Sequence, residues 1–478
     1  MPQRLTPLEV FLLALDSSRT PGQVGTVAVF EATPTSPGRP RFDLEQLRAL
    51  VEERIAFVPR YRQRVHSVPF ALAAPAWVDD AAFDLDFHVR RVVLPSPGTA
   101  EQLDEVVGRV LDDRLDRSRP LWELYLVEGL EHGRVALVEK AHPAVVDGLD
   151  TVDLAQVLLD SEPDVVEGER PQPPPWRPLP NPTPFDLIGS ALWEGAQDPY
   201  RAADNLQGLV IAGLSPVVAV AEVIDGFAAG VGDRVENAWR GRPHLARSPL
   251  AGSGSGEHRF ASLRMSLTDL RRAAADVATV HDVVLAVVTG GLRSWLLARG
   301  VSISPGSALT ALVPTAVVED EDSASSLGVH VAPHRQRLPI GEEGARERLR
   351  LVSAGALGAG DAPAVDARTL AEIPGFAAAT LHTLGVRSTR QTGAGDADLV
   401  ITDVPGPQQP LHLAGARMVE TAPVLPLLPG RVLSIGVTSY DGEVFVGLNA
   451  DGDAVGDLDV LVQALSDAFG ELLDPESS

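Results

Sequence analysis

The chain has 478 residues, 45% of them apolar, and a formal charge of −25 at neutral pH. This length indicates two or three domains, and the acidic excess excludes a broad nucleic-acid-binding surface, because phosphate contacts need clustered Lys and Arg. Cysteine is absent from the sequence, which excludes disulfides and thiolate metal sites.

The first 165 residues alternate between strand and helix patterns, as expected for a domain of mixed α/β structure. Runs of β-branched residues predict strands at 25–32 and 134–141. Apolar residues at helical spacing predict helices at 42–58 and 151–160. The start of the chain lacks the basic and apolar regions of a signal peptide, so we expect a cytoplasmic location.

Residues 166–255 differ in composition from the part that precedes them. Prolines crowd residues 167–184, which predicts an extended linker. Residues 208–232 are apolar and long enough to span a bilayer, but Pro216 and Glu222 argue against a spanning helix. We therefore predict two helices broken at Pro216, which either pack against the protein or lie on a membrane surface.

A second α/β region is predicted from residue 256 to residue 478. Near its start, the segment LTDLRRAAADV predicts a helix with Thr268 as its cap. Further strand patterns lie at 308–318 and 396–407, helix patterns at 281–300 and 457–473, and a hairpin with an Asp441-Gly442 turn at 431–451. The two halves of the chain are candidates for related domains.

The stretch VEKAHPAVVDGLD, residues 138–150, looks like an active-site loop whose central residue is missing. An apolar strand leads into His142, and Asp147 and Gly148 follow five residues later. Pro143 stands between them and can neither donate nor accept a proton. Because this loop joins a strand to a helix, it is a common place for site residues.

Seven stretches in both halves of the chain carry a resemblance to a known family. They are LTPLEVFLLALDSSRTPGQVGTVAVFE, FVPRYRQRVHSVP, PAWVDDAAFDLDFHVRRVVLPSPG, LDRSRPLWELYLVEGLEHGRVALVEKAHPAVVDG, ATVHDVVLAVVTGGLRSWLLARG, TDVPGP and SYDGEVFVGLNAD. Nearly end to end, the chain resembles the bacterial wax ester synthase/diacylglycerol acyltransferase family.

The resemblance implies an α/β fold of the chloramphenicol acetyltransferase-like superfamily. Such proteins have two related domains, a linker that crosses between them and a tunnel at their interface. We place the two domains at residues 1–165 and 256–478, with the linker and the apolar helices at 166–255. The resemblance leaves the oligomeric state open.

The resemblance also implies a reaction, the transfer of a fatty acyl group from acyl-CoA to a hydroxyl group. The acceptor would be a diacylglycerol, a fatty alcohol or an unusual hydroxyl compound. Acyl-CoA is the expected co-substrate, and we expect neither a cofactor nor a metal. The resemblance leaves open whether the protein makes peripheral contact with a membrane surface or a lipid droplet.

The family loop reads HHxxxDG, and its second histidine takes the proton of the attacking hydroxyl. Aligned on Asp147 and Gly148, His142 matches the first histidine of the motif and Pro143 the second. The aspartate of the motif is taken to hold the shape of the loop. The usual base is therefore replaced, and a general base contributes a factor of about 10²–10⁴ to a rate.

Other departures from the family fall at polar positions that face the tunnel or lie near it. An Asn-Asp pair of the family appears here as His281-Asp282, and an arginine and an asparagine appear as Val318 and Val329. Asp403 stands for the asparagine of Ser-Asn-Val-Pro-Gly-Pro. By this resemblance, Val318, Val329 and Asp403 are predicted to line the tunnel.

Two histidines remain candidates for the missing base. His142 is either a surviving base or a structural residue bonded to the backbone, and the alternation of side chains after a strand favours the structural role. His281 opens a helix, where the positive end of the helix disfavours a charged imidazole. A neutral His281 could accept a proton from across the tunnel, or it could simply be bonded locally.

Two functions of different class therefore remain open. The first is an acyltransferase with altered chemistry that uses His281, His142 or a water as base. The second is a catalytically silent homologue that binds acyl-CoA or lipid, or that acts as the partner of an active paralogue. Both would share the fold and the tunnel, so composition and pattern do not separate them.

Overall fold

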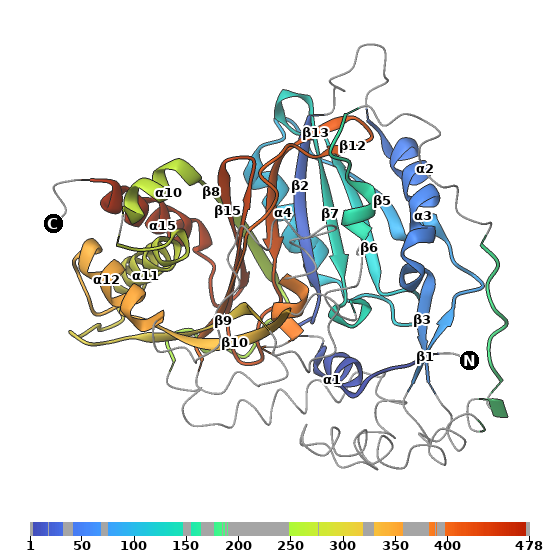
Figure 1. Cartoon of the computed structure of the whole chain (residues 1–478), viewed down its shortest axis with the longest axis horizontal. Helices are drawn as coiled ribbons and strands as arrows, with labels where there is room; N and C mark the ends of the chain where they lie inside the picture. The colour runs from blue at the N-terminus through green and yellow to red at the C-terminus, as the bar shows by residue number, and fades with distance from the viewer. Residues whose placement is uncertain are drawn as a thin grey trace.

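The computed structural model describes residues 3–17, 19–31, 42–67, 75–146, 154–163, 176–183, 185–186, 189, 248–275, 277–318, 329–356, 382–387, 389 and 397–474, with the backbone alone at 7, 315–318, 329–332 and 356. Two six-stranded sheets lie side by side at its centre, one built mainly from each half of the chain (Figure 1). A small third sheet borders the first. The predicted α/β class is confirmed.

The N-terminal sheet is mixed, with antiparallel strands at its centre and one parallel pair at its edge. In spatial order its strands are β12 (His412–Leu413), β13 (Ala416–Val424), β2 (Val24–Glu31), β7 (Arg134–Ala141), β6 (Trp122–Glu128) and β5 (Val89–Val93). Strand side chains alternate between the two faces. On β7, Val135 and Leu137 therefore join one buried cluster, and Ala136 and Val138 join another.

Helices and a small sheet cover the two faces of the N-terminal sheet. Helix α4 (Ala100–Asp112) packs on one face. The elements on the other face and around it are β1 (Gln3–Arg4), α1 (Pro7–Leu15), α2 (Leu44–Arg54), η1 (Ile55–Phe57), η2 (Pro59–Arg62), β3 (Gln63–His66), β4 (Ala76–Asp79), α3 (Leu85–His88), η4 (Glu131–Gly133), η5 (Pro143–Val145) and α5 (Leu154–Leu158). The strands β1, β4 and β3 form the third sheet.

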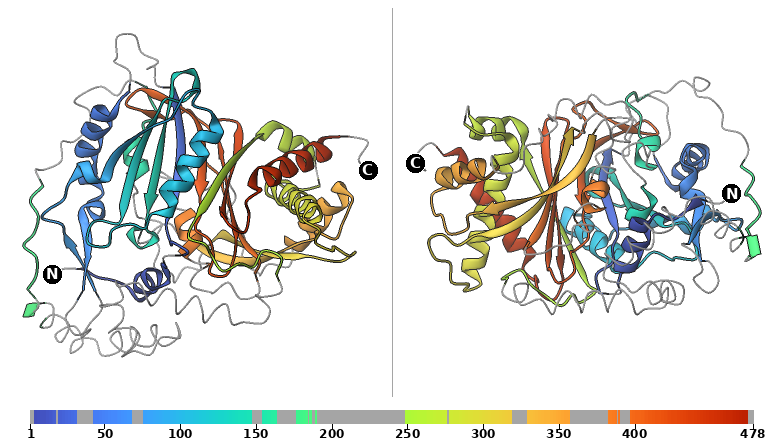
Figure 2. Two further views of the ribbon diagram at one scale, coloured as in Figure 1. Left: turned by 180° about the vertical axis from the view of Figure 1, so that it is seen from behind. Right: turned by 60° about the horizontal axis from the view of Figure 1, so that its bottom comes forward.

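The C-terminal sheet carries its helices on one face. In spatial order its strands are β10 (Val329–Leu338), β9 (Leu309–Val318), β11 (Leu399–Val404), β14 (Leu433–Tyr440), β15 (Glu443–Asp451) and β8 (His258–Ser266). The helices are α10 (Leu267–Ala274), α11 (Val280–Ala298), α12 (Ala345–Ala356) and α15 (Leu458–Leu473). The two views of Figure 2 show these helices gathered on the side of the sheet away from the N-terminal half.

Strand β13 crosses from the C-terminal half into the N-terminal sheet. It pairs antiparallel with β2, and its end passes over the open face of the C-terminal sheet. A Cβ at Gly436 or Gly447 would collide with Pro423 of β13, so these two glycines allow the close crossing. Residues beyond 256 therefore complete the first sheet, while the domain limits at 165 and 256 stay predictions.

One face of α4 packs against the edge strand β8 of the C-terminal sheet. Asp104, Gly108 and Asp112 lie four residues apart and share that face. Asp112 Oδ1 accepts a hydrogen bond of 2.6 Å from the backbone N–H of His258, and Asp104 accepts one from that of Ser262. A Cβ at Gly108 would collide with the His258 carbonyl. The edge strand β8 is thereby closed to further pairing.

Most predicted elements are found within a few residues of their expected ends. The Asp441-Gly442 turn has positive φ at both residues, as predicted for this hairpin. The cap of α10 is Ser266 and not Thr268, because the helix begins at Leu267 and places Thr268 inside its first turn. The predicted helices around Pro216 lie outside the described residues.

Of the helices that the structure describes, α11 has the length and hydropathy to cross a membrane, and 72% of its most apolar window is buried inside the protein.

Candidate active site

The motif loop begins where β7 ends, and its histidine is turned inward. The backbone N–H of His142 donates to the Leu121 carbonyl at 2.9 Å, and the ring nitrogen Nδ1 accepts from the Ala144 N–H at 3.1 Å. Only 2% of His142 is exposed. Because Nδ1 already accepts a backbone bond, these contacts favour the structural role for His142 over proton transfer.

Pro143 fits the first position of the turn η5, where no backbone N–H is needed. Its carbonyl accepts a hydrogen bond of 3.2 Å from Arg387 Nη1, and both residues are buried. The loop is thus tied to the segment 382–387 of the other half of the chain. Asp147 and Gly148, which the motif predicts to shape the loop, lie outside the described residues.

A cluster of charges next to His142 fixes the end of α1 beneath the loop. Asp16 receives hydrogen bonds from Arg117 at 2.9 Å and from Arg114 at 3.3 Å. Burial alone would raise the pKa of Asp16, but the neighbouring positive charges lower it to about 2. Asp16 therefore stays ionised at neutral pH.

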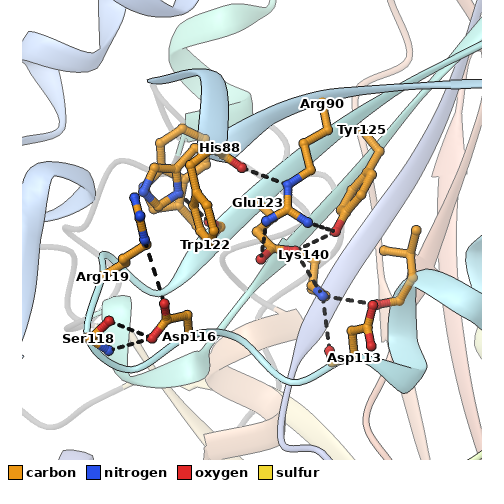
Figure 3. A network of polar contacts seen from close by, with 12 residues as sticks. His88, Arg90, Asp113, Asp116, Ser118, Arg119, Trp122, Glu123, Tyr125 and Lys140 are labelled. Atoms are coloured by element: carbon orange, nitrogen blue, oxygen red, sulfur yellow. Dashed lines mark hydrogen bonds and ion pairs between the residues drawn. The ribbon is translucent and has the colours of Figure 1, made fainter. Parts of the chain in front are cut away.

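A second network, shown in Figure 3, lies under the strand that carries the loop. Lys140, the only lysine of the sequence, is fully buried and its Nζ lies 3.0 Å from Glu123 Oε2. It also donates to the carbonyls of Val110 and Asp113 at the end of α4, each at 3.0 Å. Burial lowers the pKa of Lys140, and Glu123 opposes this. The network joins β7 to α4, and the Lys140 amine has a partner for each of its protons.

His281 forms a close pair with Asp403. Its Nδ1 lies 2.7 Å from Asp403 Oδ2, across 122 residues of sequence. The His281 side chain is 34% exposed and that of Asp403 is 18% exposed, so the pair can be reached from outside. Burial lowers the pKa of His281, but Asp403 outweighs it and the pKa is raised. The expectation of a lowered pKa from the helix end is therefore wrong, because a carboxylate in contact acts more strongly.

Asp282, the next residue, has a structural task. It is the third residue of α11, and its Oδ2 accepts from the backbone N–H and the hydroxyl of Thr279 at 2.9 Å and 2.8 Å. The Ser353 hydroxyl donates to the same oxygen at 3.0 Å. Thr279 and Asp282 form a capping box that fixes the start of α11 and thereby the position of His281.

Val318 and Val329 are brought together by the hairpin of β9 and β10. They are register partners at the end where the two strands are joined. Their side chains are not described, so their predicted place in a tunnel stays a prediction.

His382 is a buried histidine that no sequence pattern singles out. It is 3% exposed, and its Nδ1 lies 2.5 Å from Thr402 Oγ1. Burial lowers the pKa of His382 to about 3. No motif surrounds it, and its partner lies 20 residues away on β11, so only the fold reveals the pair.

The two histidine pairs lie on opposite faces of β11. Ile401 belongs to the core beneath the helices, whereas Val400 packs in a cluster with Val24 of the N-terminal sheet. By the alternation of a strand, Asp403 shares the face of Ile401, and Thr402 shares the face of Val400. The end of β11 thus carries His281 on its helix side and His382 on the side of the domain interface.

Two family models match this chain. The wax ester synthase/diacylglycerol acyltransferase catalytic domain matches residues 5–284, and the WS/DGAT C-terminal domain matches residues 362–473. Together they span well over half of the sequence.

The chain belongs to the wax ester synthase/diacylglycerol acyltransferase family.

Individual relatives agree with this assignment to a family of acyltransferase enzymes. A putative diacylglycerol O-acyltransferase of Mycobacterium bovis is 30% identical, over 98% of this chain and 98% of its own length. A putative diacylglycerol O-acyltransferase of Mycobacterium tuberculosis is 29% identical, over 99% of this chain and 90% of its own length.

Solved structures confirm the predicted two-domain fold. The wax ester synthase/diacylglycerol acyltransferase from Marinobacter aquaeolei VT8 is 26% identical, with a TM-score of 0.63 over 98% of both chains. The first condensation domain of the CDA synthetase has a TM-score of 0.53 over 100% of this chain and 97% of its own, at 14% identity, which shows the fold alone.

Within this wax ester synthase/diacylglycerol acyltransferase fold, two of the departures from the family pattern meet. His281 and Asp403 each stand where the motifs described above have an asparagine, and in this chain they form the 2.7 Å pair. Position 143, where the motif has its second histidine, holds a proline bonded only through its carbonyl to Arg387 among the contacts described. The sequence motif predicts a proton acceptor at position 143, where this chain has a proline, and the structure pairs His281 with Asp403 on the other half of the chain.

Proposed function

We propose that this chain transfers an acyl group from acyl-CoA to a hydroxyl acceptor, with His281 as the base. The acceptor would be a diacylglycerol, a fatty alcohol or a less usual hydroxyl compound. The observation that carries the proposal is the His281–Asp403 pair, formed by two departures from the family pattern at 2.7 Å.

The geometry of the pair suits a general base. A carboxylate on Nδ1 fixes the ring and its tautomer, and leaves Nε2 as the nitrogen that meets the acceptor hydroxyl. The partial exposure of the side chain gives a substrate a way to reach it. The raised pKa means that His281 must lose its proton before it can act, so the activity should rise with pH.

The reaction needs one proton transfer in each direction. His281 takes the proton of the acceptor hydroxyl as its oxygen attacks the thioester carbonyl carbon. The new C–O bond forms and the carbonyl π electrons move onto oxygen. When they return, the C–S bond breaks, and the CoA thiolate leaves with the proton that His281 held.

The test is turnover of palmitoyl-CoA with a panel of fatty alcohols and diacylglycerol, followed by release of the CoA thiol. His281→Ala should lower kcat by about 10²–10⁴, the usual contribution of a general base. His66→Ala, at a half-buried histidine of the third sheet, is the matched control. An active protein whose His281→Ala variant keeps its full kcat would contradict the proposal.

The pH profile gives a second readout. Asp403→Asn removes the carboxylate that raises the pKa of His281. The rise of kcat with pH should therefore move to lower pH in this variant. A profile that does not move would show that the pair does not set the protonation of the base.

Pro143 favours a second candidate, a homologue that binds acyl-CoA or lipid without turnover. It predicts binding of palmitoyl-CoA by the wild-type chain with no release of CoA for any acceptor in the panel. The two candidates therefore separate in the first assay.

A further inference from the structure

Residues 176–183, in the Pro-rich part of the chain, run along the outside of the N-terminal half. The segment is extended, as predicted, and contains neither helix nor strand. Figures 1 and 2 show it at the outer edge of the N-terminal half, on the side away from the C-terminal half. Every second residue from Pro178 to Pro182 is a proline. Such a chain is stiff and extended, so it loses little freedom when it docks on a surface.

Three residues of the N-terminal half form a docking site for this segment. The Trp176 ring meets the Phe83 ring edge-on, with the centroids 6.2 Å apart, and the Arg62 guanidinium lies 5.0 Å from the centre of the Trp176 ring. Three residues further along, the Leu179 N–H donates to Asp79 Oδ2 at 2.9 Å. Trp176 is only 36% exposed, although the segment lies on the surface. The docking site therefore consists of Arg62, Asp79 and Phe83.

The contacts of the segment are weak enough to open without unfolding of the N-terminal half. Leu179 is 71% exposed, and Phe185 just beyond the segment is 84% exposed. One ring contact, one cation–π contact and one exposed hydrogen bond each contribute little. Strand β4, which carries Asp79, pairs with β1 and β3 and not with the segment. A segment with so few buried apolar contacts opens locally while the core stays folded.

The docking site lies at the outer end of a column of rings. Phe83 stacks on His88 with centroids 5.2 Å apart, and His88 stacks on Trp122 at 4.6 Å. His88 Nδ1 lies 2.7 Å from the Trp122 carbonyl oxygen, and both residues are fully buried. Figure 3 shows the His88 and Trp122 rings against each other. Leu121, next to Trp122, accepts the backbone hydrogen bond of His142, so the column ends beside the start of the motif loop.

We propose that residues 176–183 are a releasable strap, and that its docking stabilises the start of the motif loop through the ring column. When the strap is docked, Trp176 covers Phe83 and limits the movement of its ring. Phe83 packs on His88, and a close-packed stack transmits a shift of one ring to the next. When the strap opens, Phe83 loses this cover and the turn at Leu121 gains freedom. The proposal goes beyond acyl transfer, because it concerns how the loop is held and not the reaction.

Amide hydrogen exchange of the full chain tests the strap and its effect on the loop. In the wild type, the Leu179 amide should exchange about tenfold or more slowly than in an unstructured chain, and much faster than the core amide of Val138 on β7. Trp176→Ala should remove the protection of Leu179. It should also speed exchange at His142, whose N–H bonds Leu121, by about three- to tenfold, and should change Val138 less.

Two further variants are the controls. Trp176→Phe keeps a ring in the docking site and should retain part of the protection of Leu179. Phe185→Ala removes an exposed ring just beyond the strap and should leave Leu179 and His142 as in the wild type. Equal loss of protection in Phe185→Ala and Trp176→Ala would count against the docking site.

Three outcomes would overturn the proposal. A Leu179 amide that exchanges in the wild type as in an unstructured chain would mean that the segment is not docked. A Leu179 amide that exchanges only as slowly as Val138 would mean that the strap does not open by itself. A His142 amide that is unchanged in Trp176→Ala, or that speeds up only as much as Val138, would mean that the strap does not stabilise the loop. Because no outcome depends on turnover, the result stands apart from the test of the proposed function.

Discussion

Single residues carry charge deep into this protein, and each such charge has partners. Lys140 is fully buried against Glu123, which also accepts hydrogen bonds from Tyr125 and Arg90 (Figure 3). A buried ion pair adds little net stability by itself, but removing one member leaves the other without compensation. The network should therefore tolerate the loss of both partners better than the loss of one.

Lys140→Met should lower the free energy of unfolding by about 3–5 kcal/mol, because it leaves Glu123 buried without its closest cation. The double variant Lys140→Met with Glu123→Leu should recover part of that loss. Urea unfolding followed by tryptophan fluorescence measures both. A single variant within about 1 kcal/mol of the wild type would show that Arg90 alone suffices for Glu123.

Pro143→His should be tolerated by the fold. The bond that Arg387 makes goes to the backbone carbonyl, which any residue supplies. The cost should stay within roughly 1–2 kcal/mol and arise mainly from a more flexible unfolded chain. Urea midpoints measure it, and thiol release shows whether activity rises. Full restoration of family-like turnover in a Pro143→His, His281→Ala double variant would show that the His281–Asp403 pair is dispensable.

At the scale of elements, the crossing of β13 is what turns two sheets into one unit. Its partner β2 comes from the other end of the chain, and the crossing depends on Gly436 and Gly447. Both glycines lie in strands, where glycine is otherwise unfavourable. Their presence is explained by close backbone approach and not by turn formation.

Gly447→Ala should destabilise the protein by about 1–3 kcal/mol or more, since the added methyl group meets the Pro423 carbonyl, which cannot move alone. Gly470→Ala, on α15 with open space around its Cβ, is the matched control and should be neutral or slightly stabilising. Thermal or urea unfolding compares them. Equal midpoints for the two variants would mean that β13 can shift without cost.

Local pattern predicts elements well here, and it predicts partners poorly. Residue type and spacing predict the strand at 134–141. They also predict the end of α11 before Gly300, which has φ +77°. The pairing of β13 with β2 could not be predicted, because it depends on contacts far apart in sequence. The same holds for His281 with Asp403, whose separate motifs gave no sign that they meet. His382 lies outside every motif, so only its buried contact with Thr402 identifies it.

At the scale of the whole molecule, helix α4 of the first half contacts strand β8 of the second half. This contact depends on a match between the spacing of two carboxylates along the helix and the spacing of two N–H groups along the strand. The eight steps from Asp104 to Asp112 rise about 12 Å along α4. The N–H groups of His258 and Ser262 on β8 are about 13 Å apart. Two carboxylates on one helix face can therefore bond two outward N–H groups of one edge strand. The contact leaves both carboxylates half-buried between the helix and the strand.

The Asp104→Asn variant should show the raised pKa of Asp104 as a difference in stability that depends on pH. Burial raises the pKa of Asp104 from 3.8 to about 8, with Glu101 and Glu420 adding to it and the Ser262 N–H opposing it. The unfolded chain thus releases a proton that the folded chain keeps, so wild-type stability falls as pH rises between these values. The advantage of Asp104→Asn over the wild type should widen from about pH 4 to pH 8 and then stay constant.

Urea midpoints across that pH range check this expectation, with the exposed Glu105→Gln on the same helix as the control for loss of one negative charge. A constant difference between Asp104→Asn and the wild type would show that Asp104 is ionised in the fold at all these pH values.

The burial of Lys140 also has a practical consequence for chemical labelling. A reagent that attacks lysine amines finds none on the folded surface, because the one lysine side chain of this sequence is enclosed. Its modification must wait for an opening that separates β7 from α4. The rate of lysine modification under native conditions would therefore measure how often the N-terminal core opens, as hydrogen exchange does for a buried amide. Attachment chemistries that depend on surface lysines will instead leave the folded core of this protein untouched.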